Sequence, residues 1–428
     1  MEVLMLFAVF FVLLFAGIPI AFALGISSAA YLFTAGIPLT IVPQRMFAGM
    51  DSFVLLCIPG FILAGNLMNV GNITEHIVRF SNAVVGHIRG GLGLANVGGS
   101  MIFGGISGTA VADAASVGAV MIPGMAKSGY DKPFAAAVTA ASSTIGPIIP
   151  PSVPMIIVGS LSGISVGRMF MAGVVPGILL ALGMMMTVYV LAVKRGYPRE
   201  KRATLKEILI EGKSAFWALL MTFIILYGII GGFFTPTEAS IVACLYALVV
   251  GLFVYKGLNW RNLPGLFVDA ALTSAALMML VGLANLFGWI LTSERIPQMI
   301  ADGILGISDN PLMVILILNL ILLFVGTFME TIAALIILFP ALLGVATGVG
   351  VDPVHFGIMA VLNLMIGLTT PPVGICLFVV SGIGEIRMSQ VARAIIPFLL
   401  CNLAVLGLVM YIPAISLWLP DLVMGPAG

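Results

Sequence analysis

The chain has 428 residues, of which 61% are hydrophobic and only 8% are charged, and its formal net charge at pH 7 is +1. Soluble domains carry about 25% charged residues, so this chain has too few charges to cover a water-soluble globule. The composition also excludes a disordered chain, and the near-zero net charge excludes a nucleic-acid-binding protein, because phosphates would find little positive charge. We therefore expect an all-α polytopic membrane protein in a lipid bilayer.

Long uninterrupted apolar stretches argue against a β-barrel, whose strands alternate polar and apolar residues in segments of about 10. Five stretches contain no Asp, Glu, Lys or Arg: residues 3–44, 133–167, 169–193, 353–384 and 394–420. The N-terminal sequence MEVLMLF lacks the basic residues of a secretory signal, so we interpret it as a retained membrane segment.

The apolar stretches predict five spans in each half of the chain. They lie near residues 2–17, 18–35, 47–70, 133–161 and 169–193, and near residues 214–233, 236–255, 266–292, 353–384 and 394–420. A single crossing by residues 2–35 is the alternative to the first two spans. Residues 91–126 and 311–349 are apolar but are interrupted by Gly, Thr and acidic residues, so we predict a re-entrant hairpin in each.

A charged linker, residues 194–213, separates the halves and holds 10 of the 35 charged residues. We predict that part of it forms a short amphipathic helix on the membrane surface. The halves, residues 1–193 and 214–428, resemble each other in four matches that occur in the same order at an offset of about 220 residues, one of them the early prolines Pro19 and Pro236. SGTAVAD at 107–113 matches VGTFMET at 325–331, GPIIPPSV at 146–153 matches GLTTPPVG at 367–374, and SGISVGRM at 162–169 matches SGIGEIRM at 381–388. These matches predict an internal duplication.

Basic residues predict the orientation of these halves. With the linker in the cytoplasm, the loops near 71–90, 127–132, 256–265 and 385–393 are cytoplasmic as well. Together these five segments hold 15 of the 18 Lys and Arg residues, leaving Arg45, Arg168 and Arg295 elsewhere. Since basic loops stay inside, the halves are predicted to be inverted copies, with the first hairpin entering from the cytoplasm and the second from outside.

Four backbone breaks are the candidate sites of chemistry. Two are the hairpin tips, 104–113 and 326–331, and two are the Pro-Pro interruptions, 146–152 and 367–374. Adjacent prolines remove helix donors, so the broken helices 133–161 and 353–384 must unwind there. In a bilayer, unwound backbone is tolerated inside protein or around a polar ligand, where carbonyls bind cations and helix N-termini favour anions. Paired breaks in inverted repeats are typical of secondary transporters, although simple kinks are an alternative.

Polar residues beside the breaks are the candidate ligands. Hydroxyls occur at Ser107, Thr109, Ser152, Thr327, Thr331, Thr369 and Thr370. Asp113 and Glu330 stand at the hairpin tips, where ion binding and helix capping are both compatible with an acid. We expect pairing or capping for Asp51, Glu238 and Asp269, which lie nearer span ends. No basic residue lies deep in a span, so an anionic solute would be held by helix N-termini, hydroxyls and bound cations.

Other functions fit the sequence less well. GKS at 212–214 lacks the upstream glycine of a phosphate-binding loop, so ATP is not expected to drive this chain directly. GISG at 105–108 matches a pattern of rhomboid intramembrane proteases with Ser107 as nucleophile, but all three histidines fall in loops or at span ends. A channel would need rings of carbonyls or charges around a continuous pore, which are not evident. We therefore expect a transporter and not an enzyme.

Three long segments resemble the large membrane subunit of TRAP (tripartite ATP-independent periplasmic, DctM-type) transporters. They are ANVGGSMIFGGISGTAVADAASVGAVMIPGM at 95–125, GYDKPFAAAVTAASSTIGPIIPPSVPMIIVG at 129–159 and GGFFTPTEASIVACLYALVVG at 231–251. The resemblance implies two partners, a small four-helix membrane subunit and a periplasmic substrate-binding protein. It also implies sodium-driven uptake of an organic acid, such as a C4-dicarboxylate or sialic acid, across the bacterial inner membrane. A stand-alone sodium-coupled carboxylate carrier of the same fold is the alternative.

The resemblance further implies an elevator, in which a domain with both hairpins slides against a scaffold and segments 71–90 and 293–310 act as connecting arms. The first sodium site would use Ser107, Gly108, Thr109, Asp113, Gly146, Pro150, Pro151 and Ser152. The second would use Gly326, Thr327, Glu330, Thr331, Gly367, Thr369, Thr370, Pro371 and Pro372. The substrate would lie between the two tips, and coupling sodium ions are the only cofactors expected.

Overall fold

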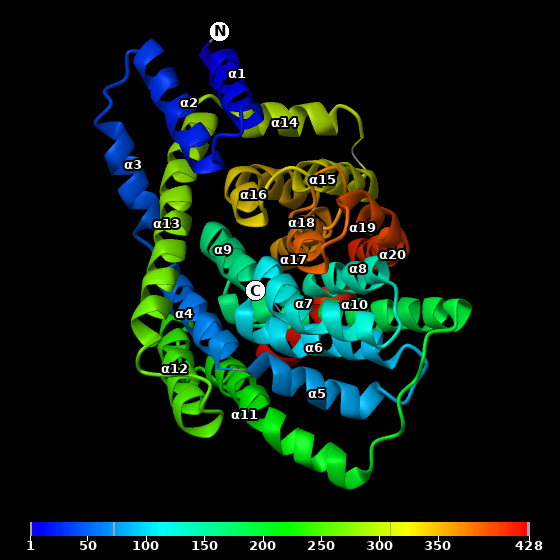
Figure 1. Cartoon of the computed structure of the whole chain (residues 1–428). Coiled ribbons are helices and arrows are strands. Elements are labelled where there is room, and N and C mark those ends of the chain that lie inside the picture. The colour runs from blue at the N-terminus through cyan, green and yellow to red at the C-terminus, as the bar shows by residue number, and fades with distance from the viewer. Residues whose placement is uncertain (1, 72, 309, 426–428) are drawn as a thin grey trace.

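The computed structural model describes residues 2–71, 73–308 and 310–425, with the side chains of residues 106 and 107 left out. Its regular elements are all helical within this part of the chain (Figure 1). The first half contains α1 (Glu2–Phe15), α2 (Ile20–Thr34), α3 (Ile41–Met50), α4 (Cys57–Val70), α5 (Ile73–Val85), α6 (Gly91–Ser107), α7 (Ala110–Lys127), α8 (Lys132–Ser143), η1 (Gly146–Ile148), α9 (Val153–Ser162) and α10 (Val166–Arg195).

The second half begins with the long helix that follows the charged linker. It contains α11 (Leu205–Ile230), α12 (Pro236–Val249), η2 (Val250–Val254), α13 (Leu263–Ser293), α14 (Ile296–Leu305), α15 (Pro311–Gly326), α16 (Thr331–Gly348), α17 (Pro353–Gly367), α18 (Ile375–Gly384), α19 (Met388–Ala394), α20 (Ile396–Tyr411) and α21 (Ala414–Met424).

Several of these helices are long and apolar enough to cross a membrane, which takes about 20 residues. In the described residues they are six segments: Lys132–Ser162, Val166–Arg195, Leu205–Ile230, Pro236–Val254, Leu263–Ser293 and Thr331–Gly348. Two further pairs of helices are apolar enough but bent, α18 with α19 and α20 with α21, and each is either a broken span or a re-entrant loop. The prediction of an all-helical, multi-pass membrane protein is therefore confirmed, while the inverted repeat stays a prediction.

The helices form two groups that lie side by side in Figure 1. One group, which we call the column, comprises α1–α4 and α11–α13, and α13 packs against α2, α3 and α4. The other group, which we call the body, comprises α6–α10 and α15–α21, in which α7 and α8 pack together and α15 packs on α17. Along the chain, α5, the linker and α14 connect the two groups. The breaks therefore all lie in the body, and the column flanks them.

Two predicted elements differ from the structure. Residues 47–70 are not one span, because α3 ends at Met50 and α4 begins at Cys57. Asp51 and Ser52 follow α3 directly, and short polar side chains favour turns over helix interiors. The short surface helix predicted in the linker is also wrong. A capping box of Thr204 and Glu207 starts α11 there, and the helix continues unbroken to Ile230.

The remaining linker, residues 196–204, is fastened to the body by hydrogen bonds. The hydroxyl of Tyr197 donates to Asp131 at 2.7 Å, and that of Tyr130 donates to the carbonyl of Pro198 at 3.3 Å. Burial raises the pKa of Tyr197 above its ordinary value of 10.0, and its bond to Asp131 raises it further. The hydroxyl therefore keeps its proton at neutral pH, and the linker stays docked where the chain passes from body to column.

Candidate functional site

The four breaks are local interruptions of helix with different backbone geometries. In the first hairpin, Gly108 takes a left-handed conformation with φ of 62° and Thr109 is extended, so the chain reverses between α6 and α7. In the second hairpin, residues 327–330 separate α15 from α16. The Pro-Pro segments separate α8 from α9 and α17 from α18, and both Pro-Pro peptide bonds are cis.

Glycine contacts bring the first hairpin tip against the first Pro-Pro break. A Cβ atom built on Gly104 would lie 2.0 Å from the Cα of Gly146, and one on Gly105 would lie 3.0 Å from the carbonyl oxygen of Pro150. A Cβ atom on Gly108 would lie 3.2 Å from the carbonyl oxygen of Pro151. Because no other residue allows this approach, the glycines place the tip backbone directly on the unwound segment.

The second tip contacts the second break in the same way. A Cβ atom on Gly367 would lie 2.5 Å from the carbonyl carbon of Gly326, and one on Gly326 would lie 3.3 Å from the Cα of Gly367. The structure thus places each tip against one Pro-Pro break, in the pairing that the sequence analysis assigned to each sodium site. Which of these groups bind an ion stays a prediction.

Asp113 is the most unusual polar residue near these contacts. Its side chain is 0% exposed, and neither carboxylate oxygen has a hydrogen-bond partner within the part of the chain that the structure describes. It lies in the first turns of α7, where its backbone N–H donates to the carbonyl of Thr109 at 3.2 Å, and Ser100 of α6 lies beside it. Burial disfavours a charged carboxylate, and a cation or a proton at this position would offset that cost.

Glu330 holds a different position at the second tip. It is the N-cap of α16, and its Oε2 atom accepts hydrogen bonds from the N–H groups of Ile332 at 2.9 Å and Ala333 at 3.2 Å. The adjacent hydroxyl of Thr331 is 1% exposed and has no hydrogen-bond partner. At this tip the acid therefore accepts hydrogen bonds from the free N–H groups at the start of α16. The neutral hydroxyl of Thr331 has no partner among the described residues.

The remaining predicted hydroxyls mostly bond to the backbone before or within a break. Ser152 caps α9 by accepting from the N–H of Met155 at 3.2 Å, and it donates to the carbonyl of Pro147. Hydroxyls of the second site donate one turn back: Thr327 to Phe324 at 2.7 Å, Thr369 to Ile366 at 2.9 Å and Thr370 to Ile366 at 2.8 Å. Donation leaves the hydroxyl oxygens able to accept or to bind a cation.

The remaining predicted site residues are the prolines of the two breaks, which differ in exposure, and two hydroxyl residues of the first tip. Pro150 and Pro151 are buried, whereas Pro371 and Pro372 are exposed. Thr109 is the N-cap of α7 and is half-buried. The side chain of Ser107, proposed both as a sodium ligand and as a protease nucleophile, lies outside the described residues.

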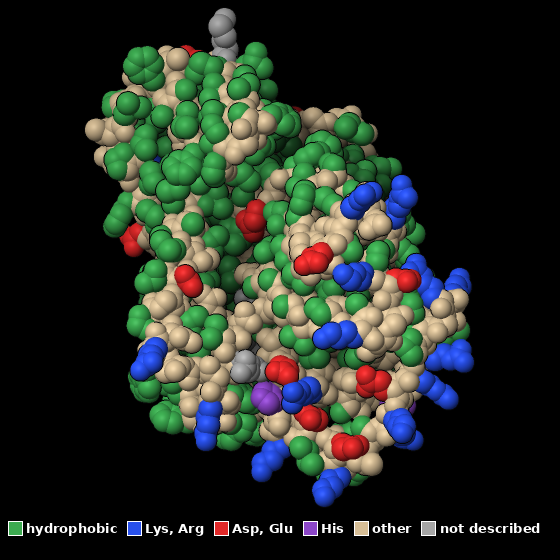
Figure 2. Space-filling model, in the orientation of Figure 1, with side chains coloured by type: hydrophobic (Ala, Val, Ile, Leu, Met, Phe, Trp, Pro, Cys, Tyr) green, Lys and Arg blue, Asp and Glu red, His purple; other side chains and the backbone are tan. Residues whose placement is uncertain are grey.

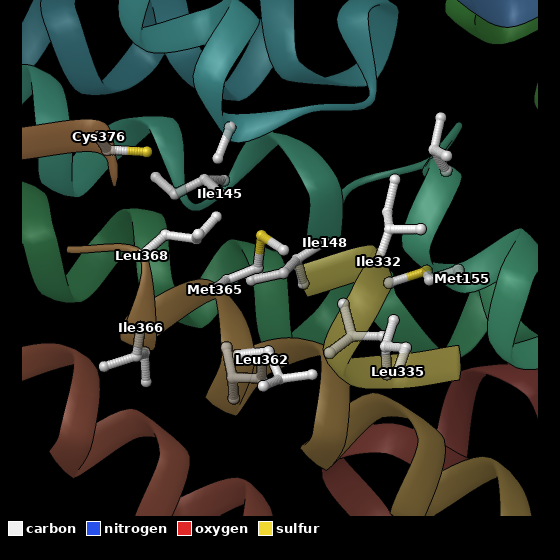
Figure 3. Close-up of a cluster of buried hydrophobic side chains, with 14 of the residues drawn as sticks. Ile145, Ile148, Met155, Ile332, Leu335, Leu362, Met365, Ile366, Leu368 and Cys376 are labelled. Atoms are coloured by element: carbon white, nitrogen blue, oxygen red, sulfur yellow. The ribbon is translucent and has the colours of Figure 1, made fainter. Parts of the chain in front are cut away.

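A layer of buried apolar side chains lies between the two breaks (Figure 3). It includes Ile145, Ile148, Met155, Ile332, Leu335, Leu362, Met365, Ile366, Leu368 and Cys376. Ile148 belongs to η1 at the first break, and Leu368 follows α17 at the second. Close packing between these side chains therefore couples the positions of the two breaks.

The three acids expected to have structural roles lie outside this region. Glu238 forms a capping box with Thr235 at the start of α12, which confirms the capping prediction for this residue. Asp51 is the C-cap residue of α3, and Asp269 is exposed on α13.

A cleft between column and body is the feature that sequence reasoning missed. A cavity of about 680 Å³ lies between α13, α14 and α16, and an adjoining cavity of about 270 Å³ shares Asn285 and Ile336 with it. Figure 2 shows the surface hollowed between the two groups of helices. Across the smaller cavity the hydroxyls of Ser52, from the column, and Ser160, from α9, lie 3.2 Å apart. The residues that line the two cavities come from five separate segments, so no local motif marks them.

The apolar spans and the paired helix breaks together define the class, a polytopic membrane transporter. The sequence profile of the tripartite ATP-independent periplasmic transporter DctM component matches residues 7–415. The chain therefore belongs to the DctM family of TRAP transporter large components, as the sequence motifs predicted.

Individual relatives agree with this assignment. The chain is 45% identical to the sialic acid TRAP transporter large permease protein SiaM of Vibrio cholerae, over 96% of this chain and 97% of that protein. It is 38% identical to the C4-dicarboxylate TRAP transporter large permease protein DctM of the same species, over 100% of this chain and 99% of that protein. Since the relatives are permeases, the prediction that the chain is not an enzyme is confirmed. The alternative of an intramembrane serine protease is therefore rejected.

The fold also matches a solved structure. The crystal structure of the YdaH transporter of Alcanivorax borkumensis superposes with a TM-score of 0.65, covering 92% of this chain and 90% of that one. The sequence identity is 14%, so this likeness concerns the fold alone.

Proposed function

We propose that this chain is the large membrane subunit of a sodium-coupled transporter that imports an organic acid across the bacterial inner membrane. A periplasmic binding protein would deliver the acid, and a small four-helix membrane subunit would complete the complex. The large permeases of sialic acid and C4-dicarboxylate transporters are its relatives, and both of these solutes carry carboxylates. The proposal names the class of solute and not one compound.

The observation that carries sodium coupling is the buried, unpartnered carboxylate of Asp113. A sodium ion between this tip and the first Pro-Pro break would offset the charge, with backbone carbonyls of the break as further ligands. The second break would hold another ion through carbonyls and the hydroxyls of Thr369 and Thr370. An anionic solute between the tips would then meet two cations and the N-terminus of α9, although no basic residue is present there.

The test is uptake by the complete transporter in proteoliposomes. The chain is reconstituted with a small subunit and a binding protein from the same organism, and uptake of labelled sialic acid and succinate is measured. We expect uptake with an inward sodium gradient and none with potassium in its place. Equal uptake in both would reject sodium coupling. Uptake without the binding protein would instead favour the stand-alone carrier.

The elevator part of the proposal rests on the contact between column and body. The hydroxyls of Ser52 and Ser160 lie 3.2 Å apart and bridge the two groups, so a pair of cysteines at these positions is a cross-linking probe of this contact. We expect oxidation of the Ser52→Cys, Ser160→Cys double variant to block uptake and reduction to restore it. The two single variants are the controls. Full uptake by the cross-linked protein would show that the groups need not move apart.

A further inference from the structure

The larger cleft has a chemistry that differs from that of the hairpin tips. Arg45 is the one charged side chain among its lining residues, and its other polar side chains are the neutral Asn285, Thr292 and Gln298. Leu161, Ile336 and several small residues supply apolar walls. A volume of about 680 Å³ falls in the range of small-molecule sites. Among the described residues, the cleft therefore combines a positive charge with apolar walls, and no carboxylate lines it.

Arg45 is held in place but keeps its charge available. Its guanidinium lies over the ring of Trp289, 4.7 Å from the ring centroid. Among the described residues it takes part in no ion pair. Stacking uses the face of the guanidinium, so the N–H groups around its edge stay free to donate, and their planar arrangement suits a carboxylate.

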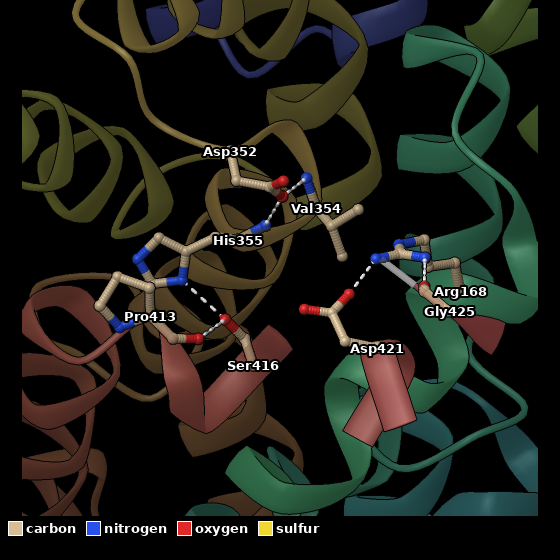
Figure 4. Close-up of polar contacts among 8 residues, drawn as sticks. All are labelled: Arg168, Asp352, Val354, His355, Pro413, Ser416, Asp421 and Gly425. Carbon is tan, nitrogen blue, oxygen red and sulfur yellow. Dashed lines mark hydrogen bonds and ion pairs between the residues drawn. The ribbon is translucent and has the colours of Figure 1, made fainter. Parts of the chain in front are cut away.

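The other two arginines outside the cytoplasmic segments do not share this environment. Arg168 is nearly buried, pairs with Asp421 and donates to the carbonyl of Gly425 at 2.7 Å, which fastens α21 to α10 (Figure 4). Arg295 is exposed, as Arg45 is, but it lies at the start of α14 and does not line the cleft. Only Arg45 of these three is both unpaired and placed in a cavity.

The predicted orientation places the cleft on the side from which an imported solute comes. With the linker in the cytoplasm, α11 runs outward, α12 returns, and α13 runs outward again, so its last turns and α14 lie at the outer face. The lining residues of α13 fall between Ala284 and Thr292, and α14 contributes Pro297, Gln298 and Ala301. Leu161 lies at the end of α9, next to the outer loop before α10.

We propose that this cleft is an outer binding site for the organic acid, in which Arg45 pairs with the solute's carboxylate before the solute reaches the hairpin tips. The inference rests on the proposed import of an organic acid. Asn285 and Gln298 would contact further polar groups of the solute. This site supplies the basic recognition group that the region between the tips lacks.

The first experiment measures the concentration dependence of sialic acid and succinate uptake by the complete transporter in proteoliposomes. Removing one charge-assisted contact in Arg45→Gln is expected to raise KM about tenfold with little change in maximal rate. Arg45→Lys keeps a cation and should lie between this variant and the parent. Arg295→Gln removes the same charge near the same face, outside the cleft, and should transport like the parent. Equal KM values for the parent and both glutamine variants would overturn the proposal.

The second experiment detects occupancy without transport or the binding protein. Thr292→Cys places a thiol in the cleft, and a membrane-impermeant charged thiol reagent is added with or without sialic acid or succinate. We expect labelling that either solute slows, and no slowing when Arg45→Gln is added to the same protein. Absence of labelling would show that the cleft is closed to solutes from outside, and labelling that neither solute slows would show that the cleft does not bind them. Either result rejects the outer site, whereas loss of uptake by the parent protein would reject the proposed function.

Discussion

The two hairpin tips resemble each other in backbone contact but differ in charge. At each tip a glycine packs directly against the glycine that precedes a Pro-Pro break: Gly104 against Gly146, and Gly326 against Gly367. At the first tip a buried carboxylate, Asp113, has no hydrogen-bond partner. At the second tip the acid caps a helix. The two tips therefore share a backbone contact but differ in the polar side chain that is left without a partner among the described residues.

The difference arises from the helix starts. Thr109 and Glu330 are the N-cap residues of α7 and α16, so Asp113 lies one turn deeper in its helix than Glu330 does. Matching the letters of SGTAVAD and VGTFMET instead pairs Asp113 with Thr331, the other buried side chain without a partner at the tips. Proximity to a tip thus does not make two acids equivalent; the position relative to the N-cap decides which one is free.

The largest effect is expected from glycine substitutions at the tip contacts. In Gly104→Ala the new Cβ would lie 2.0 Å from the backbone of Gly146, so the hairpin or the break must move. We expect a loss of about 3 kcal/mol in stability, read as a lower unfolding temperature in detergent, and loss of uptake. Gly326→Ala, at 3.3 Å from Gly367, should cost less. Gly407→Ala, with nothing within 4 Å, is the control. Equal losses of stability in Gly104→Ala and Gly326→Ala would contradict the expectation that the shorter Cβ distance costs more.

Exchange of the two acids for amides tests their roles directly. Asp113→Asn removes the unpartnered charge and should weaken the apparent sodium affinity of uptake about tenfold or more, as expected for an ion ligand. Glu330→Gln weakens a helix cap and should lower stability by about 1 kcal/mol while leaving sodium affinity nearly unchanged. Sodium titration of uptake and thermal unfolding of both variants decide between these outcomes. If Glu330→Gln shifts sodium dependence more than Asp113→Asn does, our distinction between the tips is wrong.

A smaller effect on sodium dependence is expected at the second break. Thr369 is 0% exposed, and its hydroxyl already donates to Ile366. Thr369→Ala should weaken sodium affinity about fivefold, because a neutral oxygen ligand is lost, and Thr369→Ser should restore it. Ser274→Ala removes a comparable backbone-bonded hydroxyl from α13, away from the breaks. The same loss in both alanine variants would indicate a general packing effect.

The smallest effect is expected from Glu238→Gln on α12. Glu238 forms a capping box with Thr235, and α12 belongs to the column. We expect a stability loss of less than about 1 kcal/mol and unchanged sodium dependence. A shift in sodium affinity as large as that of Asp113→Asn would place the ion chemistry outside the tips.

Sequence alone predicted the features that depend on local chemistry. Sparse charge and long apolar stretches required a membrane protein, because the residues of a span must suit hydrocarbon wherever they lie in the fold. Adjacent prolines required breaks near 150 and 371, since proline removes helix donors. Long motifs identified the family. The interruption after Met50 was missed because Asp51 and Ser52 form a weak local signal within an apolar stretch.

Only the tertiary structure decided which groups face one another. Gly104 contacts Gly146 although α7 and α8 lie between them along the chain. Arg45 lines the same cleft as residues of α13, α14 and α16. The sequence could place Asp113 and Glu330 near tips, but hydrogen bonding and burial depend on neighbours that fold into place from elsewhere. Composition and motifs therefore determined the class and the family, whereas packing between distant segments decided which groups meet at the breaks and which line the cleft.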